Sequence, residues 1–313
     1  MKRLIAWAAA AALICAMPLC ISGYYVNLLT EVAIYAVLAM TIDLLAGYAG
    51  RTPLGHGALF GIGAYFAGYT VAVRQGGVLE AVLLGIGATM AVSLLFALLA
   101  IRTSGVSFLL LTLAQGMIVW GVCVRWTSVT GAENGIRGIA RPAPVADPIR
   151  FYYLAVLVAS LAAWALWRFV NSPFGLTLRG IRESETRMRT LGYNVPLHLM
   201  IGFVVSGTFA GLAGTLYAFF NTFVSPTNVA LATSVKGLLM AIIGGVGTLF
   251  GSFVGAAVVI LLENFVSVFT DRWPTVLGMI FVATMLFARE GILGKARLLW
   301  AHSPRLTHKG DQE

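Results

Sequence analysis

Residues 171–195 read NSPFGLTLRGIRESETRMRTLGYNV and lie between two apolar runs, residues 151–169 and 198–220. Each run is long enough to cross the ~30 Å hydrocarbon layer of a bilayer as a helix. The segment between them is rich in arginine, which cannot lie in hydrocarbon, and the positive-inside rule places such a loop in the cytoplasm. The arrangement therefore predicts a membrane protein with a polar cytoplasmic segment, residues 170–195, between two spanning helices.

The polar segment also has an amphipathic pattern. If it is helical, Leu178, Ile181, Met188 and Leu191 form one narrow apolar stripe, with charged residues on the other faces. A short amphipathic helix on the cytoplasmic side of a membrane protein is suited to docking into a groove on a soluble partner. We therefore expect this segment to bind another protein.

The composition of the whole chain excludes a soluble fold. Hydrophobic residues make up 59% of the chain and charged residues 11%, and the mean hydropathy is +0.89. Soluble domains carry about 25% charged residues. Neither polar stretch, 125–150 or 170–195, is long enough to bury a core of its own in water. The sequence predicts one membrane domain, 1–313, with 125–150 as a periplasmic loop.

The net charge of +9 does not indicate a nucleic-acid-binding protein, because the basic residues collect at predicted membrane edges, where topology requires them. Cys15, Cys20 and Cys123 lie in apolar surroundings without metal-ligand spacing, so we interpret them as packing residues. The expected environment of this chain is the lipid bilayer.

Hydropathy predicts an all-α polytopic bundle of about ten transmembrane helices with glycine-broken segments. The uncharged run 237–262 is long for one span, and each glycine within GGVGTLFG (244–251) costs about 1 kcal/mol in a helix interior. We therefore divide this run into two short spans. The first span resembles a secretory signal but has no convincing cleavage site before Ser22, so we expect it to be retained. Outside the run 237–262 we expect eight spans: this first one, 4–21, and then 28–46, 57–73, 78–100, 105–124, 151–169, 198–220 and 274–288.

The ten-span arrangement agrees with the charge distribution. It places most lysines and arginines on the cytoplasmic side together with both termini, whereas nine spans would place the basic C-terminal tail outside. A weak internal repeat is also present, because GYAG (47–50) and GGVG (244–247) each precede a Gly-x-x-x-Gly pattern. Paired interrupted segments are typical of transporters, although glycine is frequent in any membrane helix.

Residues that could support catalysis are few. The sequence contains no HExxH, DxxxD or GxSxG motif, and its glycine run lacks the lysine of a nucleotide-binding loop. Ionisable residues at membrane level include Glu31, Asp43, His56 and Glu263, and Lys236 stands at a predicted span edge. Asp43 has a functional and a structural interpretation of equal weight. For His56, a structural role is favoured over metal binding, because it has no neighbouring histidine or cysteine.

Five motifs, the first of which has three parts (28–36, 43–50 and 54–65), resemble those of branched-chain amino acid ABC importer permeases of the LivM type. The resemblance extends from about residue 27 to residue 291, and the motifs follow the order of that family. Residues 175–192 are similar to the segment through which such permeases couple to their ATPases. The other motifs are LLTEVAIYA (28–36), DLLAGYAG (43–50), LGHGALFGIGAY (54–65), TGAENGI (130–136), AGLAGTLYA (210–218) and GGVGTLFG (244–251).

The resemblance implies a multi-pass permease of the bacterial inner membrane. Its implied partners are a second related permease subunit, two cytoplasmic ATPases that use ATP and Mg, and a periplasmic binding protein. The chain itself has no cofactor, no metal site and no catalytic residue of its own. The ATPase-coupling residues that the resemblance implies are Gly175, Arg179, Arg182, Glu183, Glu185 and Gly192.

Three departures from the family pattern stand out. Arg51-Thr52-Pro53 occupies a position that is usually less charged, Arg187-Met188 replaces small residues, and Asp43 stands where asparagine is frequent. The first leaves the neighbouring glycine turn uncertain, and the second could alter the fit to the ATPase. The third adds a charge without an assigned purpose.

The translocation path is less evident from the sequence. Thr112, Gln115, Asn221 and Ser225, together with Asn228, are polar residues within or beside spans that could line it, although local hydrogen bonding explains each of them as well. A stand-alone secondary transporter or channel for a small polar solute remains the alternative function. That alternative requires ionisable residues in the membrane for ion coupling and no docking helix.

Overall fold

The computed structural model describes residues 17–18 and 22–270, together with residues 275, 276, 278, 279, 282, 286 and 291. Most of the predicted spans 4–21 and 274–288 lies outside this part of the chain. The long helices are α2 (Gly23–Asp43), α3 (His56–Ala72), α4 (Val78–Ala100), α5 (Gly105–Arg125), α7 (Pro148–Val170), α10 (Val195–Asn221), α11 (Leu231–Gly244) and α12 (Gly251–Ser267).

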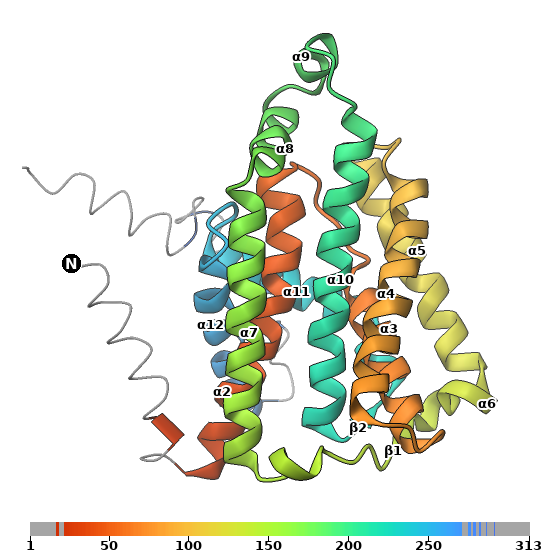
Figure 1. Cartoon of the computed structure of the whole chain (residues 1–313). Helices are drawn as coiled ribbons and strands as arrows, with labels where there is room; N and C mark the ends of the chain where they lie inside the picture. Colours follow the sequence, from red (N-terminus) through yellow and green to blue (C-terminus); the bar gives the residue numbers. More distant parts are fainter. Residues whose placement is uncertain are drawn as a thin grey trace, which may run out of the picture.

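The remaining elements are short. A π-helical turn, Leu44–Tyr48, extends α2, and two short helices, α8 (Pro173–Glu183) and α9 (Glu185–Thr190), form the polar segment. At the opposite end of the molecule lie α6 (Thr127–Thr130), β1 (Ile136–Arg137) and β2 (Phe223–Val224), as Figure 1 shows. The two polar stretches of the sequence therefore lie at opposite ends of the bundle.

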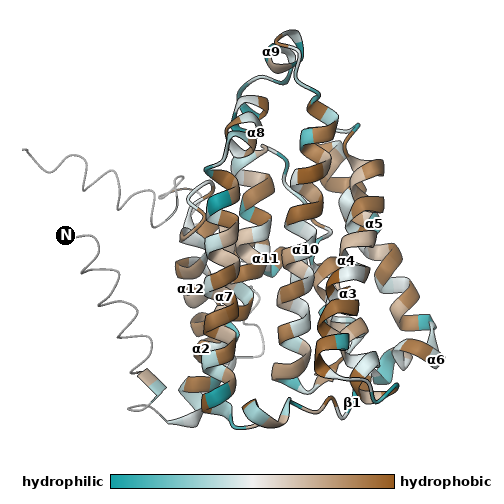
Figure 2. Ribbon diagram, viewed as in Figure 1, coloured by the Kyte–Doolittle hydropathy of each residue, from teal (hydrophilic) through white to brown (hydrophobic). Residues whose placement is uncertain are grey.

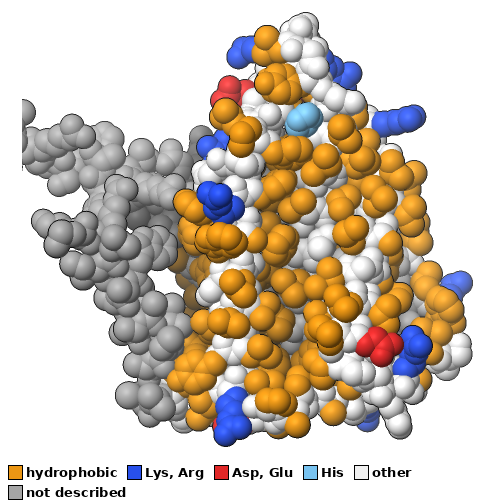
Figure 3. All heavy atoms as spheres, viewed as in Figure 1, with side chains coloured by type: hydrophobic (Ala, Val, Ile, Leu, Met, Phe, Trp, Pro, Cys, Tyr) orange, Lys and Arg blue, Asp and Glu red, His pale blue; other side chains and the backbone are white. Residues whose placement is uncertain are grey.

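The helices have the length and composition of membrane spans. Within the described residues, six are long and apolar enough to cross a bilayer. Hydrophobic residues dominate the middle of the bundle, and charged residues gather mainly near its two ends (Figures 2 and 3). On α4 and α5, large apolar side chains such as Leu79, Leu99 and Val106 are strongly exposed. The prediction of an all-α polytopic membrane protein is confirmed.

The core forms around α2, α3 and α10. Residues 33–40 of α2 are almost entirely buried, and α3, α4 and α10 pack against one another. Small residues allow these helices to approach closely: a Cβ on Gly63 would meet the backbone of Gly211, and one on Gly214 would meet the backbone of Phe60. Close backbone approach of this kind stabilises helix pairs in lipid, where the hydrophobic effect between helices is weak.

Two helices begin inside the bundle. The N-terminal ends of α3 and α11 meet, and the backbone N–H of Gly57 donates to Ser234 Oγ at 2.8 Å. The connections before these helices, 49–55 and 222–230, interrupt the α-helices, and the second contains a 3₁₀ turn, Pro226–Asn228. They are tolerated because most of their residues are buried in protein. The predicted break in the run 237–262 is also confirmed, since α11 ends at Gly244 and α12 begins at Gly251.

The outer connections are held by a small antiparallel sheet and by Arg141. In the sheet, Ile136 pairs with Val224. Arg141 donates from Nη2 to the carbonyl oxygen of Phe220 at 2.7 Å, and its guanidinium lies over the ring of Phe151. Burial lowers the pKa of Arg141, but an arginine retains its charge at neutral pH. The loop after α5 is therefore fixed to the end of α10.

Candidate functional site

The polar segment forms two helices because of its serines. The hydroxyl of Ser172 accepts from Gly175 N at 3.4 Å and caps α8, with Pro173 as the first helical residue. Ser184 has an extended backbone, and its hydroxyl accepts from Arg187 N at 3.3 Å, which starts α9. Capping serines are favoured at helix starts because they satisfy otherwise unpaired N–H groups. The segment is thus a helix–break–helix unit rather than one amphipathic helix.

The apolar stripe of this segment is buried against the chain itself. Leu178, Ile181 and Met188 are 0%, 4% and 9% exposed, whereas Leu191 is 66% exposed. The expectation that all four form one continuous apolar face for a partner is therefore wrong. An amphipathic pattern identifies a face that must be covered, and here α10 and the rest of the membrane domain cover most of it.

The exposed residues of the polar segment lie mainly between the end of α8 and the residues just after α9, and a few more lie nearer the start of α8. Glu183 and Arg187 are exposed, Leu191 lies just after α9, and Leu176 of α8 is 68% exposed. Gly192 has a φ of 87°, in the left-handed region that favours glycine, and it ends the segment after α9. These residues are available to a partner.

The two predicted coupling arginines of α8 contact the membrane domain. The guanidinium of Arg179 lies 4.9 Å from the ring centre of Tyr48 and donates to the carbonyl oxygen of Val170 at 3.3 Å. Arg182 donates from Nη1 to the carbonyl oxygen of Gly47. The arginines therefore attach α8 to the end of α2 and the end of α7.

Gly175 explains how α8 can lie so close to α7. A Cβ at this position would collide with the backbone of Val170. Glycine is therefore required here for the close approach of the two helices.

Glu185 is the centre of an ion-pair network. Its carboxylate oxygens lie 2.7 Å from Arg51 Nη2 and 2.6 Å from Arg189 Nη2. Arg51 also donates to the carbonyl oxygen of Thr103 and lies over the ring of Phe108. The unusual arginine at position 51 thus connects the start of α9 to the connection between α4 and α5.

Asp43 joins two glycine turns. Its Oδ1 accepts from Gly247 N at 2.6 Å and its Oδ2 from Leu249 N at 2.9 Å, and the side chain is fully buried. The adjacent π-helical turn supplies the Gly47 carbonyl to which Arg182 donates. The end of α2, the turn 245–250 and helix α8 therefore meet around one carboxylate, which supports the structural interpretation of Asp43.

His56 has a structural environment. Its Nε2 lies 2.6 Å from Ser206 Oγ, and Ser206 donates its own proton to the carbonyl oxygen of Thr41 at 2.7 Å. The imidazole therefore donates from Nε2, and its edge packs against Phe203. Among the described residues, no group of three His, Cys, Asp or Glu side chains could hold a metal ion.

The candidate path residues each have a hydrogen-bonding partner within the chain. Thr112 accepts from Leu54 N at 3.0 Å and donates to Leu109 O, so it supports the non-helical connection before α3. Gln115 donates to Phe96 O at 3.2 Å, which joins α5 to α4. Both contacts explain these residues without a substrate.

The other two candidates lie after α10. Ser225 N donates to Asn228 Oδ1 at 2.9 Å in a capping box that begins a 3₁₀ turn, Pro226–Asn228. Asn221 is exposed at the end of α10 and donates to Phe223 O at 3.3 Å. The structure therefore gives both residues local hydrogen-bonding roles.

An ion cluster at membrane level was not predicted. Lys236 Nζ pairs with Glu263, lies 3.7 Å from Glu31 Oε1, and lies 4.3 Å from the ring centre of Tyr35. Glu31 is eight residues along α2 from Gly23, about 12 Å into the bundle. The assignment of Lys236 to a span edge is therefore wrong, because α11 begins inside the bundle. The signal in the sequence was that two acidic residues, Glu31 and Glu263, and one basic residue, Lys236, stand isolated in or beside apolar runs.

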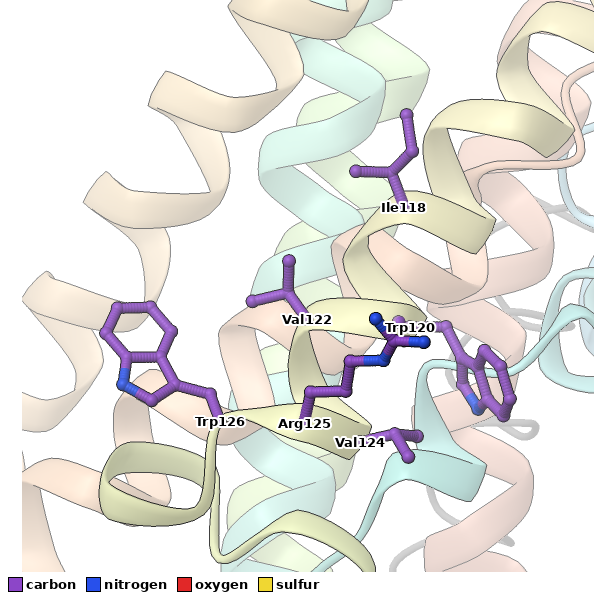
Figure 4. A pocket seen from close by; sticks show the side chains of 7 residues that line it. Ile118, Trp120, Val122, Val124, Arg125 and Trp126 are labelled. Atoms are coloured by element: carbon purple, nitrogen blue, oxygen red, sulfur yellow. The ribbon is translucent and has the colours of Figure 1, made fainter.

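A cavity of about 710 Å³ lies along the end of α5 near its last residue, Arg125. All of its lining residues belong to this single stretch of chain, and Trp120 and Trp126 point to opposite sides of it (Figure 4). The lining side chains do not converge, so this cavity lacks the geometry of a binding site.

The chain is similar to known membrane permeases. A protein-family model described as "Branched-chain amino acid transport system / permease component" matches residues 24–289. The chain belongs to this family. It is a membrane permease component, which agrees with the helical bundle and with the interpretation from the sequence.

The relatives of the chain include several permeases. LivM, a high-affinity branched-chain amino acid transport system permease protein of Salmonella typhimurium, is 27% identical over 90% of this chain and 73% of its own length. BraD of Pseudomonas aeruginosa, also described as a high-affinity branched-chain amino acid permease protein, is 24% identical over 86% of this chain and 94% of its own. The guanosine ABC transporter permease NupQ of Bacillus subtilis is 37% identical over 24% of each chain. No solved structure matches the chain.

Proposed function

We propose that this permease imports branched-chain amino acids across a bacterial inner membrane in an ATP-driven complex. The complex contains a second related permease subunit, two cytoplasmic ATPases that use ATP and Mg, and a periplasmic binding protein. The α8–α9 segment and both termini face the cytoplasm, in agreement with the charge asymmetry of the sequence. The family match and the descriptions of the related permeases support this assignment.

The observation that carries the proposal is the α8–α9 segment. It extends beyond the ends of the long helices (Figure 1) and exposes Leu176 and Leu191 among polar residues. Arg182 attaches the segment to the carbonyl oxygen of Gly47, and Glu185 attaches it to Arg51 of the membrane domain. An exposed apolar side chain on a short anchored helix fits a groove on a soluble ATPase.

The attachments provide a route for mechanical coupling. A movement of α8 would act through Arg182 on the end of α2, and a movement of α9 would act through Arg51 on the connection between α4 and α5. Asp43 would carry the first movement to the turn between α11 and α12. Closure of the ATPases on ATP would thus reorient helices that begin inside the bundle.

The substrate assignment rests on coverage of the relatives. LivM and BraD, both described as branched-chain amino acid permeases, match 90% and 86% of this chain. Permeases named LivH, with the same described substrate, match 40% and 44%, a tyrosine permease matches 44%, and the guanosine permease matches 24%. Leucine, isoleucine and valine are therefore the substrates that these relatives favour.

The alternative, a secondary transporter, has less support. Its ion-coupling candidates in the membrane are Glu31, Asp43 and Glu263. The two glutamates share Lys236, and Asp43 accepts two backbone N–H bonds. Carboxylates that are already paired within the chain are poor candidates for binding a coupling ion.

The test is uptake of radiolabelled leucine into vesicles that contain the complete complex. Uptake that requires ATP, both ATPases and the binding protein would support the proposal, and a Walker A lysine variant of the ATPase serves as the control. Uptake by this chain alone on an ion gradient would favour the secondary transporter. Guanosine uptake without leucine uptake would retain the importer and change its substrate.

A further inference from the structure

A second cavity, of about 620 Å³, opens at the end of the bundle that carries α8. It lies between the end of α2, the end of α7, helix α8 and the turn 245–250. Cavities that bind small molecules commonly have volumes of about 300–1,000 Å³. The residues of its lining that matter here are Tyr48, Trp167, Asn171, Arg179, Arg182 and Thr248.

The charges around this cavity favour an anion. Its lining contains Arg179 and Arg182 and no acidic residue. Asp43, whose carboxylate accepts from Gly247 N and Leu249 N of the adjacent turn, does not itself line the cavity. The guanidinium groups of Arg179 and Arg182 therefore supply the charge that faces a bound group.

Both guanidinium groups keep donors for a ligand. Arg179 is seen to use Nη2 on Val170 O, and Arg182 uses Nη1 on Gly47 O. A guanidinium has five N–H donors, so each arginine retains several that these bonds do not use. A planar guanidinium group can donate two parallel hydrogen bonds to one phosphate group, so two arginines match a phosphate better than two lysine ammonium groups would.

The position of the cavity favours a lipid as the source of the phosphate. Trp167, at its edge, lies in the last turn of α7, where an indole ring suits the boundary between membrane and water. Further along α7 toward the membrane centre, Trp164, Leu161 and Leu157 are 60%, 57% and 58% exposed. Their spacing of three and four residues places them on one face of the helix. Figure 3 shows hydrophobic side chains over this part of the surface.

We propose that this cavity, the headgroup site, binds the phosphate of an anionic phospholipid of the cytoplasmic leaflet. The acyl chains lie along the exposed face of α7, and the phosphate accepts from Arg179 and Arg182. The choice of leaflet rests on the orientation proposed above, but binding itself does not. Basic cavities at the cytoplasmic side of helical membrane proteins are suited to anionic headgroups.

Occupancy of the headgroup site would bridge three parts of the molecule. Arg179 and Arg182 belong to α8, Tyr48 belongs to the end of α2, and Thr248 belongs to the turn before α12. A lipid bound to these residues holds α8 against the membrane domain at the place where movement of α8 must be transmitted. The lipid is thus a structural component of the coupling region.

The test is native mass spectrometry of the purified full-length chain with phosphatidylglycerol and phosphatidylcholine of equal chain length. We expect preferential retention of phosphatidylglycerol. Arg179→Gln should reduce its affinity about tenfold, because one charged hydrogen-bonding partner is lost. The matched control is Arg168→Gln, an exposed arginine in the last turn of α7 that does not line the cavity. It should leave the affinity unchanged.

Competition and cross-linking measurements then distinguish a bound lipid from a free anion and from a docked protein. Inorganic phosphate and glycerophosphoglycerol should compete weakly, because they lack acyl chains. Equal affinity of the parent chain and Arg179→Gln for phosphatidylglycerol would overturn the proposal. Competition by the soluble anions as strong as that of the lipid would assign the cavity to a free anion instead. Cross-linking of position 179 to an ATPase, with loss of the lipid in the complex, would assign it to protein docking.

Discussion

Asp43 and Gly247 are 204 positions apart in the sequence, yet the carboxylate of Asp43 accepts from the backbone N–H of Gly247 at 2.6 Å. The same carboxylate accepts from Leu249 N, and Asp43 is fully buried. One side chain therefore connects the end of the first described long helix to the turn between the last two. The weak repeat between the two glycine-rich motifs corresponds to two turns that contact each other.

Replacement of Asp43 should destabilise the protein. Asp43→Ala leaves the buried N–H of Leu249 and the partly buried N–H of Gly247 without acceptors, and a fully buried group of this kind costs about 1–3 kcal/mol. Asp43→Asn keeps one acceptor oxygen, so we expect a smaller loss. The measurement is the thermal unfolding temperature of the detergent-solubilised chain, followed by tryptophan fluorescence. Asp147→Ala, which removes an exposed helix cap, is the control and should have a small effect. An unfolding temperature of Asp43→Ala equal to that of the parent would contradict this account.

The contact between Glu185 and Arg51 should hold α9 in place. Glu185→Gln weakens the pairs to both Arg51 and Arg189, and we expect faster tryptic cleavage after Arg187 and Arg189. The pair is partly exposed, so its contribution should be about 1 kcal/mol or less and should fall at high salt. Glu183→Gln, two positions earlier and exposed, provides the control. Equal cleavage rates for the two variants would show that Glu185 does not fix the segment.

Much of the architecture could be predicted from the sequence, because membrane spans depend on local composition. The break between α11 and α12 followed from the cost of glycine in a helix. Local composition could not predict which residues of the apolar stripe in the polar segment are covered by the rest of the chain. Leu178 and Leu191 have the same pattern in sequence, but only the contacts of the folded chain decide which one is covered.

The site residues were harder to predict than the fold. Lys236, Glu31 and Glu263 come from three separate helices, so no local pattern brings them together. Thr112 and Ser225 looked like path residues because they are polar in apolar surroundings. Thr112 accepts from Leu54 N in the connection before α3, and Ser225 belongs to the capping box of the 3₁₀ turn before α11. The position of both connections in the bundle is a property of the tertiary fold.

The exposed leucine after α9 should be required for ATPase binding. Leu191→Asp should abolish co-purification with the ATPases and leave the unfolding temperature unchanged, because Leu191 is 66% exposed. Leu178→Asp is the matched comparison. It places a charge at a position with 0% exposure and should unfold the segment or the protein. Undiminished co-purification of Leu191→Asp would remove this residue from the docking surface.

The ion cluster makes the sharpest prediction about stability. Lys236→Met leaves Glu31 and Glu263 close together at membrane level without their cation, in a cluster whose side chains are 14–24% exposed. Breaking a fully buried ion pair costs about 3–5 kcal/mol, which is the upper bound for this partly buried cluster. We expect little folded protein from this variant. The triple variant Glu31→Gln, Lys236→Met, Glu263→Gln carries no charge in the cluster, and its unfolding temperature should return close to that of the parent.

Vesicle uptake by the triple variant then distinguishes structure from transport. Leucine uptake close to that of the parent complex would show that the cluster serves packing between α2, α11 and α12. A stable triple variant without uptake, but with normal ATPase co-purification, would show that the charges themselves act on the translocated solute. An unfolding temperature of Lys236→Met equal to that of the parent would contradict the pairing, because two carboxylates would then be tolerated at membrane level without their partner.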